Sequence, residues 1–392
     1  MLDTVILSGA RTPIGSFLGS LSTFSAPQLG AIAIGEAISR AGVRPDEVDE
    51  VIMGCVLTGG IGQAPARQAL IAAGLPTSVP ALTINKVCGS GMKSVMLAAQ
   101  AVQLGDSQIV VAGGMESMSS APYLLDKART GYRMGHAKVI DSMIHDGLWD
   151  PYNDCHMGSC GDSTAKDLGF SREQLDEYSA ESYRRALDAQ QNGRFDAEIV
   201  SVEVPQRKGD PILISQDEEP GKGNPAKLAS LKPAFSKDGV TTAGNASSLN
   251  DGGAALVVTN LKQAERLGKT PLGRLRGYTT YAQEPTQFTT APGIAIERLL
   301  NQAGLTVSDI DLFEVNEAFA VVAMAAMQKL DIPHEKVNVN GGAVAIGHPI
   351  GMTGTRLILT ALLELERRGG RYAIASPCIG GGEATAVLLE RI

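Results

Sequence analysis

Basic side chains, aromatic side chains and long apolar runs are all scarce in this chain of 392 residues. Its 34 lysines and arginines are outnumbered by 42 aspartates and glutamates, and the net charge of −8 argues against nucleic-acid binding, which requires a basic surface. No apolar run reaches the ~20 residues that span a bilayer, and the N-terminus lacks the charged-then-apolar pattern of a signal peptide. We therefore expect a cytoplasmic protein that binds neither membranes nor nucleic acid.

Cysteine patterns typical of disulfides and metal sites are also missing. The five cysteines are an odd number in a long chain, which favours reduced thiols in a reducing compartment over a disulfide framework. Cys155 and Cys160 have no second cysteine pair and no histidine pair at zinc-finger spacing. We therefore predict no metal site.

Short apolar segments rich in β-branched residues alternate with helical patterns along the chain. Thr4–Leu7, Val51–Cys55 and Ile109–Ala112 have the pattern of strands. Leu29–Ala41 and Met92–Leu104 have the pattern of amphipathic helices, and each is followed by a glycine that ends it. This βαβ order predicts an α/β fold in which helices cover a sheet.

The order of these elements is repeated. Helices that begin at Ala26-Pro27 and at Ala291-Pro292 each end in Ala-Gly, and each leads through an aspartate-bearing turn to a strand. Later, GSGMKSVMLAAQAVQLG (89–105) precedes the strand QIVVAGG, as GMTGTRLILTALLELERRGG (351–370) precedes RYAIASP. The repeat predicts a duplicated domain with pseudo-twofold symmetry.

Residues 120–249 interrupt this rhythm. They hold most of the histidines, the single tryptophan and a polar run at Gln216–Lys227, and their best-defined element is a predicted helix at Arg172–Gln191. We predict an N-terminal half at 1–119, completed by about 250–270, and a C-terminal half at 271–392. Residues 120–249 would form an inserted loop domain, and insertions over a rigid scaffold commonly form binding surfaces.

Two cysteines lie where chemistry is expected. Cys88, in NKVCGSGMKS, immediately precedes a predicted helix, whose dipole would lower the pKa of the thiol and favour the thiolate. Cys378, in SPCIGGGEA, is followed by three glycines, whose backbone amides suit the lining of a site. A buried structural thiol for Cys88 and a flexible turn beside a buried thiol for Cys378 remain alternatives.

His348 and Asn316 are further candidates. His348 stands between glycine and proline where a strand gives way to a helix, and histidine is the usual base at neutral pH. Asn316 follows the predicted strand Leu312–Val315, where a carboxamide can hold a water or an oxyanion. The alternatives are a loop histidine and a helix N-cap.

Taken together, the motifs resemble those of the thiolase family, in the same order and over nearly the whole chain. They are VCGSGMKS, GGMESMS, HMGSC, GNASSLNDGGAA, NEAF, NGGAVAIGHPIGMTG and CIGGGEA. The resemblance implies a duplicated αβαβα layered fold with an inserted loop domain for coenzyme A (CoA) binding and assembly. It also implies reversible Claisen condensation of two acetyl-CoA to acetoacetyl-CoA and CoA, or thiolysis of 3-ketoacyl-CoA.

The resemblance also implies roles for single residues. Cys88 is the nucleophile that becomes acylated, His348 takes its proton, and Cys378 removes or returns the α-proton of an acetyl group. Asn316 is expected to hold an oxyanion-hole water with His348, and the amides of Cys88 and Gly380 to form a second oxyanion hole. The substrate-binding positions implied are Leu148, His156, Met157, Phe235, Ala243, Ser247, Leu249, Phe288, Ala318 and Phe319.

The segment EPTQFTTAP, which contains Phe288, resembles a potassium-activated branch of the family more closely than the branch that has Met-Gly at this position. The preferred length of the acyl chain is therefore left open. CoA thioesters are the expected substrates, and no tightly bound cofactor is expected. Potassium activation stays open, because Gly244 replaces an alanine among the positions near the ion. Those positions are Tyr183, Ala243, Gly244, Ala246 and Val344.

Three other functions remain to be weighed. One is a thiolase for longer 3-ketoacyl-CoA chains, and another is a ketoacyl synthase, which pairs its cysteine with two histidines. The third is a non-catalytic acyl-CoA or lipid carrier, which would need neither both thiols nor His348. We also expect a homodimer or homotetramer, in which the apolar strand Ile109–Ala112 helps a sheet to continue across a subunit boundary.

Overall fold

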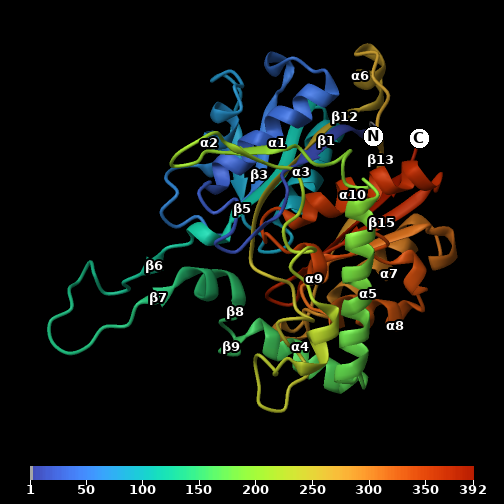
Figure 1. Ribbon diagram of the computed structural model, residues 1–392. Coiled ribbons are helices and arrows are strands. Elements are labelled where there is room, and N and C mark those ends of the chain that lie inside the picture. The colour runs from blue at the N-terminus through green and yellow to red at the C-terminus, as the bar shows by residue number, and fades with distance from the viewer. Residues whose placement is uncertain (1–2) are drawn as a thin grey trace.

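The computed structural model describes residues 3–392, and an 11-stranded sheet runs through them (Figure 1). One half of the sheet has the order β1 (Thr4–Arg11), β12 (Asn250–Asn260), β5 (Ile109–Ser117), β3 (Glu50–Gly54), β4 (Ala81–Ile84). The other half has the order β13 (Gly273–Ala282), β17 (Glu383–Glu390), β15 (Tyr372–Ser376), β14 (Leu312–Val315). The halves join where β1 pairs with β13 through just two residue pairs, so the sheet behaves as two sheets with a short seam.

Helices form three layers around the two half-sheets. The central layer is α3 (Ser90–Leu104) with α10 (Thr353–Arg368), and its apolar side chains share one core with inward-facing residues of both halves, such as Ile6 and Leu389. The outer layers are α1 (Ala26–Ala41) with α2 (Pro65–Ala72), and α7 (Ala291–Ala303) with α8 (Ala320–Leu330). Because successive residues of a strand face opposite sides of the sheet, each half-sheet contributes side chains to two hydrophobic cores. The predicted αβαβα layering is confirmed.

The two halves repeat the same order of elements, as the sequence predicted. The series β1, α1, β3, α2, β4, α3, β5, β12 matches β13, α7, β14, α8, a single bridge, α10, β15, β17. The bridge joins Phe313 to Val337 in parallel and takes the place of β4. Smaller elements are β2 (Gly15–Ser16), β16 (Cys378–Ile379), α6 (Leu261–Arg266) and α9 (Ala343–Ile346).

The helix ends follow local sequence signals. α1 ends at Gly42 with φ 59° and α3 ends at Gly105 with φ 83°, both in the left-handed region that favours glycine. The amphipathic pattern placed the start of α1 at Leu29, three residues late, whereas the internal repeat placed it correctly at Ala26-Pro27. The helix begins at Ala26 because Ser25 and Gln28 form a capping box and Pro27 fits the first turn.

The segment between β5 and β12 forms a separate group of elements. It contains the hairpins β6 (Tyr123–Leu124) with β7 (Ile140–Asp141), β8 (Trp149–Asp150) with β9 (Cys155–His156), and β10 (Val202–Val204) with β11 (Ile212–Ile214). Its helices are α4 (Met157–Leu168) and α5 (Arg172–Gln191), the latter with the predicted bounds. The division of the chain into domains at 119, 249 and 271 stays a prediction. None of the helices within residues 3–392 has the length and apolar character needed to cross a membrane.

The expectation for Ile109–Ala112 at a subunit boundary was wrong. These residues belong to β5, which pairs with β12 on one side and with β3 on the other, so β5 has no free edge. The free edge of this half-sheet is β4, where Leu82 is 43% exposed. An apolar run of β-branched residues is typical of a strand buried on both faces, which is the interior position that β5 occupies.

Close packing of β5 against the loop before α10 gives a test of the fold. A Cβ on Gly114 would lie 2.0 Å from the backbone oxygen of Gly351, whereas a Cβ on Gly35 in α1 has nothing within 4 Å. We expect Gly114→Ala to lower the free energy of unfolding by about 1–3 kcal/mol. Gly35→Ala should raise it by about 0.5–1 kcal/mol, because alanine favours helix. Urea unfolding of both variants measures this, and equal effects would contradict the packing.

Candidate active site

Cys88 sits on a strained turn between β4 and α3. Val87, directly before it, has φ 45°, which is unusual for a β-branched residue and costs free energy. The turn is held by side chains: Asn85 Oδ1 accepts from the N–H of Val87 at 2.9 Å, and Ser90 Oγ accepts from the N–H of Lys86 at 2.8 Å. Ser90 Oγ also donates to the oxygen of Val87 at 2.7 Å. The strain is therefore stabilised locally and fixes the position of the thiol.

The expectation that the helix start lowers the pKa of Cys88 below its ordinary value was wrong. Cys88 opens onto a cavity, but the protein around it raises the pKa of the thiol to about 12 by burial. The backbone N–H groups of Gly380 and Cys88 lower this pKa, as the helix-start argument anticipated, yet burial has the larger effect. The thiol therefore rests in its neutral form.

His348 is held in one tautomer by its neighbours. Its Nδ1 lies 2.7 Å from Thr353 Oγ1, and that hydroxyl donates to the oxygen of Pro349 at 2.9 Å. The hydroxyl of Thr353 has only one proton, which it donates to Pro349, so it can only accept a hydrogen bond from His348. Nδ1 therefore carries the ring proton, and Nε2 is left as an acceptor. Nε2 faces Asn316 Nδ2 at 3.3 Å, and the backbone N–H of His348 donates to Asn250 Oδ1 at 2.8 Å.

The charge state of His348 follows from its surroundings. Burial, with a smaller contribution from the positive charge of Arg356, lowers the pKa of the imidazole to about 3. The ring is therefore neutral throughout the neutral pH range, and its Nε2 can accept a proton.

Asn316 lies behind His348 at the end of β14. It is not a helix N-cap, because α8 begins at Ala320 and its N-cap residue is Phe319. Its side chain is fully buried, and Oδ1 has no hydrogen-bond partner within residues 3–392. An unpartnered buried carboxamide oxygen is rare in a structural role and suits a site that receives a polar ligand.

Cys378 is a second neutral thiol next to the first. It lies in β16 and is fully buried. Burial, followed by the charge of Cys88, raises the pKa of Cys378 well above its ordinary value, while the N–H groups of Cys378 and Ala318 lower it. Cys88 affects the pKa of Cys378, and the N–H of Gly380, in the glycine-rich loop that follows Cys378, affects the pKa of Cys88. The two thiols therefore lie close to each other.

A cavity of about 410 Å³ brings most of the predicted site residues together. Cys88, His348 and Gly380 line it, whereas Asn316 and Cys378 are fully buried and are not among its lining residues. All ten predicted substrate positions also line it: Leu148, His156, Met157, Phe235, Ala243, Ser247, Leu249, Phe288, Ala318 and Phe319. The cavity is thus lined mainly by apolar side chains and carries the reactive groups among them.

Aromatic rings build one wall of this cavity. His156 stacks on Phe235 with ring centres 4.5 Å apart, and Phe235 meets Phe319 edge to face at 6.0 Å. Phe288 in turn meets Phe319 at 6.3 Å. His156 also accepts the N–H of Gly158 through Nδ1, which fixes its ring at the start of α4. An aromatic wall suits an extended, largely apolar ligand arm.

Several supporting residues were missed by the sequence analysis. Glu116 accepts the N–H groups of Val56, Leu57 and Gly351 at 3.1, 3.1 and 2.9 Å, and so ties two active-site loops together. Burial raises the pKa of Glu116 to about 7. The motif GGMESMS pointed to this segment but not to its carboxylate. Other missed cavity residues are Val87, Met118, Met143, Ile144, Gly147, Ala234, Ser248 and Ile350.

A thiol nucleophile, a neutral imidazole and a second thiol around an apolar cavity define an acyl-transferring enzyme of the cysteine type. Residues 4–262 match the family Thiolase, N-terminal domain, and residues 269–391 match Thiolase, C-terminal domain. The chain therefore belongs to the thiolase family.

Relatives of known name share the full length of the chain. It is 53% identical over 392 residues to the acetyl-CoA acetyltransferase of Cupriavidus necator, with 100% of both chains covered. It is 52% identical over 390 residues to acetyl-CoA acetyltransferase 2 of Arabidopsis thaliana, covering 99% of this chain and 97% of the relative. The crystal structure of the Bacillus anthracis acetyl-CoA acetyltransferase superposes with a TM-score of 0.98 at 41% identity, covering 100% of this chain and 99% of that chain.

The tautomer of His348 can be tested through Thr353. Thr353→Val removes the hydroxyl that accepts from Nδ1–H, whereas Thr353→Ser keeps it. Loss of one hydrogen bond of about 1 kcal/mol should lower kcat roughly 5-fold in the valine variant with little change in KM, and serine should restore the rate. Steady-state kinetics of both variants measure this. A valine variant with wild-type kcat would show that Thr353 does not orient the imidazole.

Proposed function

We propose that this chain is an acetyl-CoA C-acetyltransferase that catalyses the reversible condensation of two acetyl-CoA to acetoacetyl-CoA and CoA. The observation that carries the proposal is that Cys88, His348 and Gly380 all line the apolar cavity, and that Asn316 Nδ2 lies 3.3 Å from Nε2 of His348. The names of the full-length relatives in Cupriavidus necator and Arabidopsis thaliana support it.

In the first half-reaction, Cys88 is acylated. His348 Nε2 takes the thiol proton while Sγ attacks the thioester carbonyl of the first acetyl-CoA. The backbone N–H groups of Cys88 and Gly380 already act on this sulfur, and they are placed to stabilise the negative oxygen of the tetrahedral intermediate. The C–S bond to CoA then breaks, and CoA leaves with the proton from His348.

In the second half-reaction, a carbon–carbon bond forms. Cys378 gives its thiol proton to Nε2 of His348, and the resulting thiolate removes an α-proton from the second acetyl-CoA. The enolate oxygen is held beside Asn316 and the protonated His348. The enolate carbon attacks the acetyl group on Cys88, the Cys88 sulfur leaves, and it recovers a proton from His348. The products are acetoacetyl-CoA and the free enzyme, and the two separate half-reactions imply ping-pong kinetics.

The arrangement also bears on the alternatives. A ketoacyl synthase needs two histidines beside its cysteine, but the second histidine of this cavity, His156, stacks on Phe235 and caps α4. A non-catalytic carrier has no need for two thiols and an imidazole with a fixed tautomer. Turnover of acetoacetyl-CoA with free CoA separates an enzyme from a carrier, since a carrier would bind the thioester and leave it intact.

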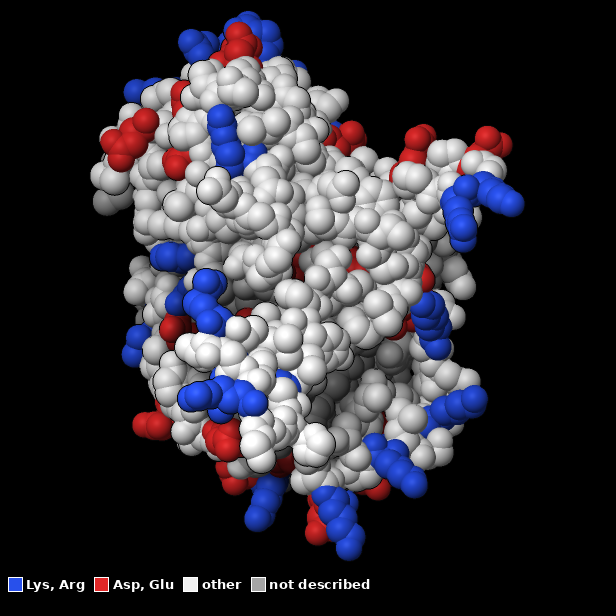
Figure 2. All heavy atoms as spheres, turned by 90° about the vertical axis from the view of Figure 1, so that its left-hand side faces the viewer, with Lys and Arg blue, Asp and Glu red and all other residues white. Residues whose placement is uncertain are grey.

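The proposal involves no tightly bound cofactor, because the chain itself supplies a nucleophile, a base and oxyanion donors. Figure 2 shows a hollowed face of the molecule with several lysine and arginine side chains near the hollow, although the chain as a whole is acidic. Basic side chains on this face suit the phosphates of CoA. Of the potassium positions, Ala243 and Ala246 line the cavity, and comparison of rates in KCl and NaCl at equal ionic strength tests for activation by the ion.

Division of labour between the two thiols is the central test. Cys88→Ala should take up no acetyl group from acetyl-CoA. Cys378→Ser should still be acetylated on Cys88, because acylation needs no α-proton removal. It should condense about 10²–10⁴-fold more slowly, since serine is a poor base. Mass spectrometry of peptides locates the acetyl group, and exchange of α-hydrogens of acetyl-CoA with deuterium from solvent reports on Cys378.

Cys55→Ala is the matched control, because Cys55 is a buried thiol that does not line the cavity. It should be acetylated like the wild type. Failure of Cys378→Ser to take up acetyl, or wild-type hydrogen exchange in that variant, would refute the assignment of the two thiols.

Chain-length preference is tested at Phe288, a buried side chain that lines the cavity. We propose that it limits the acyl chain. Thiolysis should be fastest with acetoacetyl-CoA and slower with six- and eight-carbon 3-ketoacyl-CoA. Phe288→Ala should raise the relative rate on the longer substrates by opening space. If the wild type prefers the longer substrates, the chain is a thiolase of longer chain specificity.

We propose a homodimer or homotetramer in which the free edge of β4 pairs with a second copy, since exposed strand edges readily add another strand. The β6–β7 arm projects from the body (Figure 1) and carries exposed apolar side chains, including Met134. Leu82→Arg should yield a smaller assembly by light scattering, and Leu104→Arg, at an exposed leucine in α3, should not. A monomeric wild type at 40.9 kDa would refute the proposal.

We also propose a cytoplasmic location, because all five cysteines are free, as in a reducing compartment. Recovery of the full chain mainly in a membrane or secreted fraction of its cells would contradict this.

A further inference from the structure

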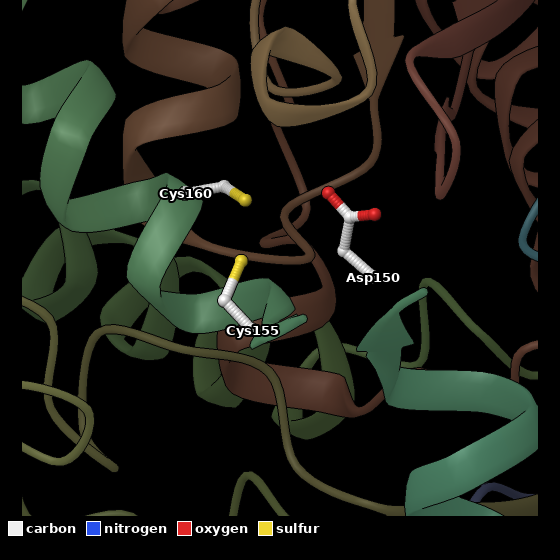
Figure 3. Close-up of side chains that lie close together, drawn as sticks. All are labelled: Asp150, Cys155 and Cys160. Carbon is white, nitrogen blue, oxygen red and sulfur yellow. The ribbon is translucent and has the colours of Figure 1, made fainter. Parts of the chain in front are cut away.

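A second pair of thiols, Cys155 and Cys160, lies where β9 meets α4 and is separate from the catalytic residues. Figure 3 shows the side chains of Asp150, Cys155 and Cys160 pointing toward one another, and one ligand atom from each lies within 4.8 Å of the others. Asp150 and Cys155 are directly opposite in the β8–β9 hairpin, and Cys160 is in the first turn of α4. Regular backbone hydrogen bonding therefore fixes all three positions.

The carboxylate of this cluster is buried and ordered. Asp150 is 2% exposed, and the hydrogen bonds that its carboxylate accepts within the described residues come from neutral groups. Its Oδ1 accepts the N–H groups of Tyr152 and Asn153 at 2.8 and 3.2 Å, and its Oδ2 accepts Nδ2 of Asn153 at 2.8 Å. Burial of a carboxylate beside two thiols without a cation is costly, and it is the arrangement that attracts a metal ion.

We propose that Asp150, Cys155 and Cys160 bind one soft divalent cation of the Zn²⁺ class. Zinc binds thiolate at about 2.3 Å and carboxylate at about 2.0–2.2 Å, and three protein ligands leave its fourth position to solvent. Two sulfurs on a tetrahedral ion lie about 3.8 Å apart, so the cluster needs only a small contraction. On binding, the two thiols release their protons to solvent and coordinate as thiolates.

The site is coupled to the acyl-CoA cavity through the chain between its ligands. His156 and Met157 lie between Cys155 and Cys160, and both line the cavity. A bound ion would tie the β8–β9 turn to the first turn of α4 and so hold His156 against Phe235. This consequence rests on the proposed function: the loaded enzyme should have a lower KM for acyl-CoA than the stripped enzyme, with kcat unchanged.

Metal binding itself is tested without substrate. The reduced protein carrying Cys88→Ala, which removes the catalytic thiol as a competing ligand, is titrated with Zn²⁺ against a chromogenic chelator and with Co²⁺ by visible absorption. One ion per chain is expected, with a sulfur-to-cobalt charge-transfer band. Cys155→Ser and Cys160→Ser should each abolish saturable binding. Asn153→Ala should weaken it about 10–100-fold, because Asn153 orients the Asp150 carboxylate.

Cys55→Ala in the same background is the control and should bind like its parent. Thermal unfolding of each serine variant shows whether it is folded. Retained binding in either folded serine variant would overturn the proposal, as would the absence of saturable Zn²⁺ binding at micromolar concentration. Wild-type affinity in both Asp150→Asn and Asn153→Ala would overturn the role of the carboxylate. Because no acyl-CoA is present, these outcomes are independent of whether the enzyme condenses acetyl groups.

Discussion

The close crossing of α3 and α10 in the central layer is the constraint on which the active site depends. A Cβ on Gly91 would lie 2.5 Å from Thr355 Oγ1, and a Cβ on Gly354 would lie 2.5 Å from the backbone nitrogen of Met92. Only glycine at both positions lets the first turns approach so closely. Because the halves are duplicated, the loops that enter these two helices meet at the crossing. One loop carries Cys88 and the other carries His348.

The duplication extends to the groups that hold these loops. Ser90 and Thr353 are the first residues of α3 and α10, and each uses its hydroxyl to bond back to the loop that precedes it. In one half the hydroxyl stabilises the strained backbone at Val87. In the other it fixes the tautomer of His348. The same hydrogen bond from the first residue of a helix therefore fixes the backbone before Cys88 in one half and the position of the ring proton of His348 in the other.

Local sequence signals predicted an α/β fold and its internal repeat, whereas the αβαβα layering and the residues of the cavity came from the resemblance of the motifs to those of thiolases. Strand and helix periods, glycine stops and long motifs are all readable along the chain, as at Arg172–Gln191 and Gly42. The position of β5 was misjudged because pairing partners are set by tertiary structure, and a doubly buried strand has the same composition wherever it lies. The thiol pKa was misjudged for a related reason. The dipole at Cys88 is local, whereas the larger effect of burial comes from residues far apart in sequence, such as Met118 and Ile350.

The neutral resting state of the site has a chemical consequence. Burial lowers the pKa of His348 to about 3 and raises that of Cys88 to about 12, so a resting thiolate–imidazolium pair is strongly disfavoured. The proton therefore moves from Cys88 to His348 only as the sulfur attacks a carbonyl, when negative charge passes to an oxygen that faces N–H donors. A permanently charged thiolate would be open to oxidation and alkylation between turnovers. Burial thus links nucleophile formation to substrate binding, and the same apolar wall that raises the thiol pKa also shields the acyl-enzyme from water until the second thioester arrives.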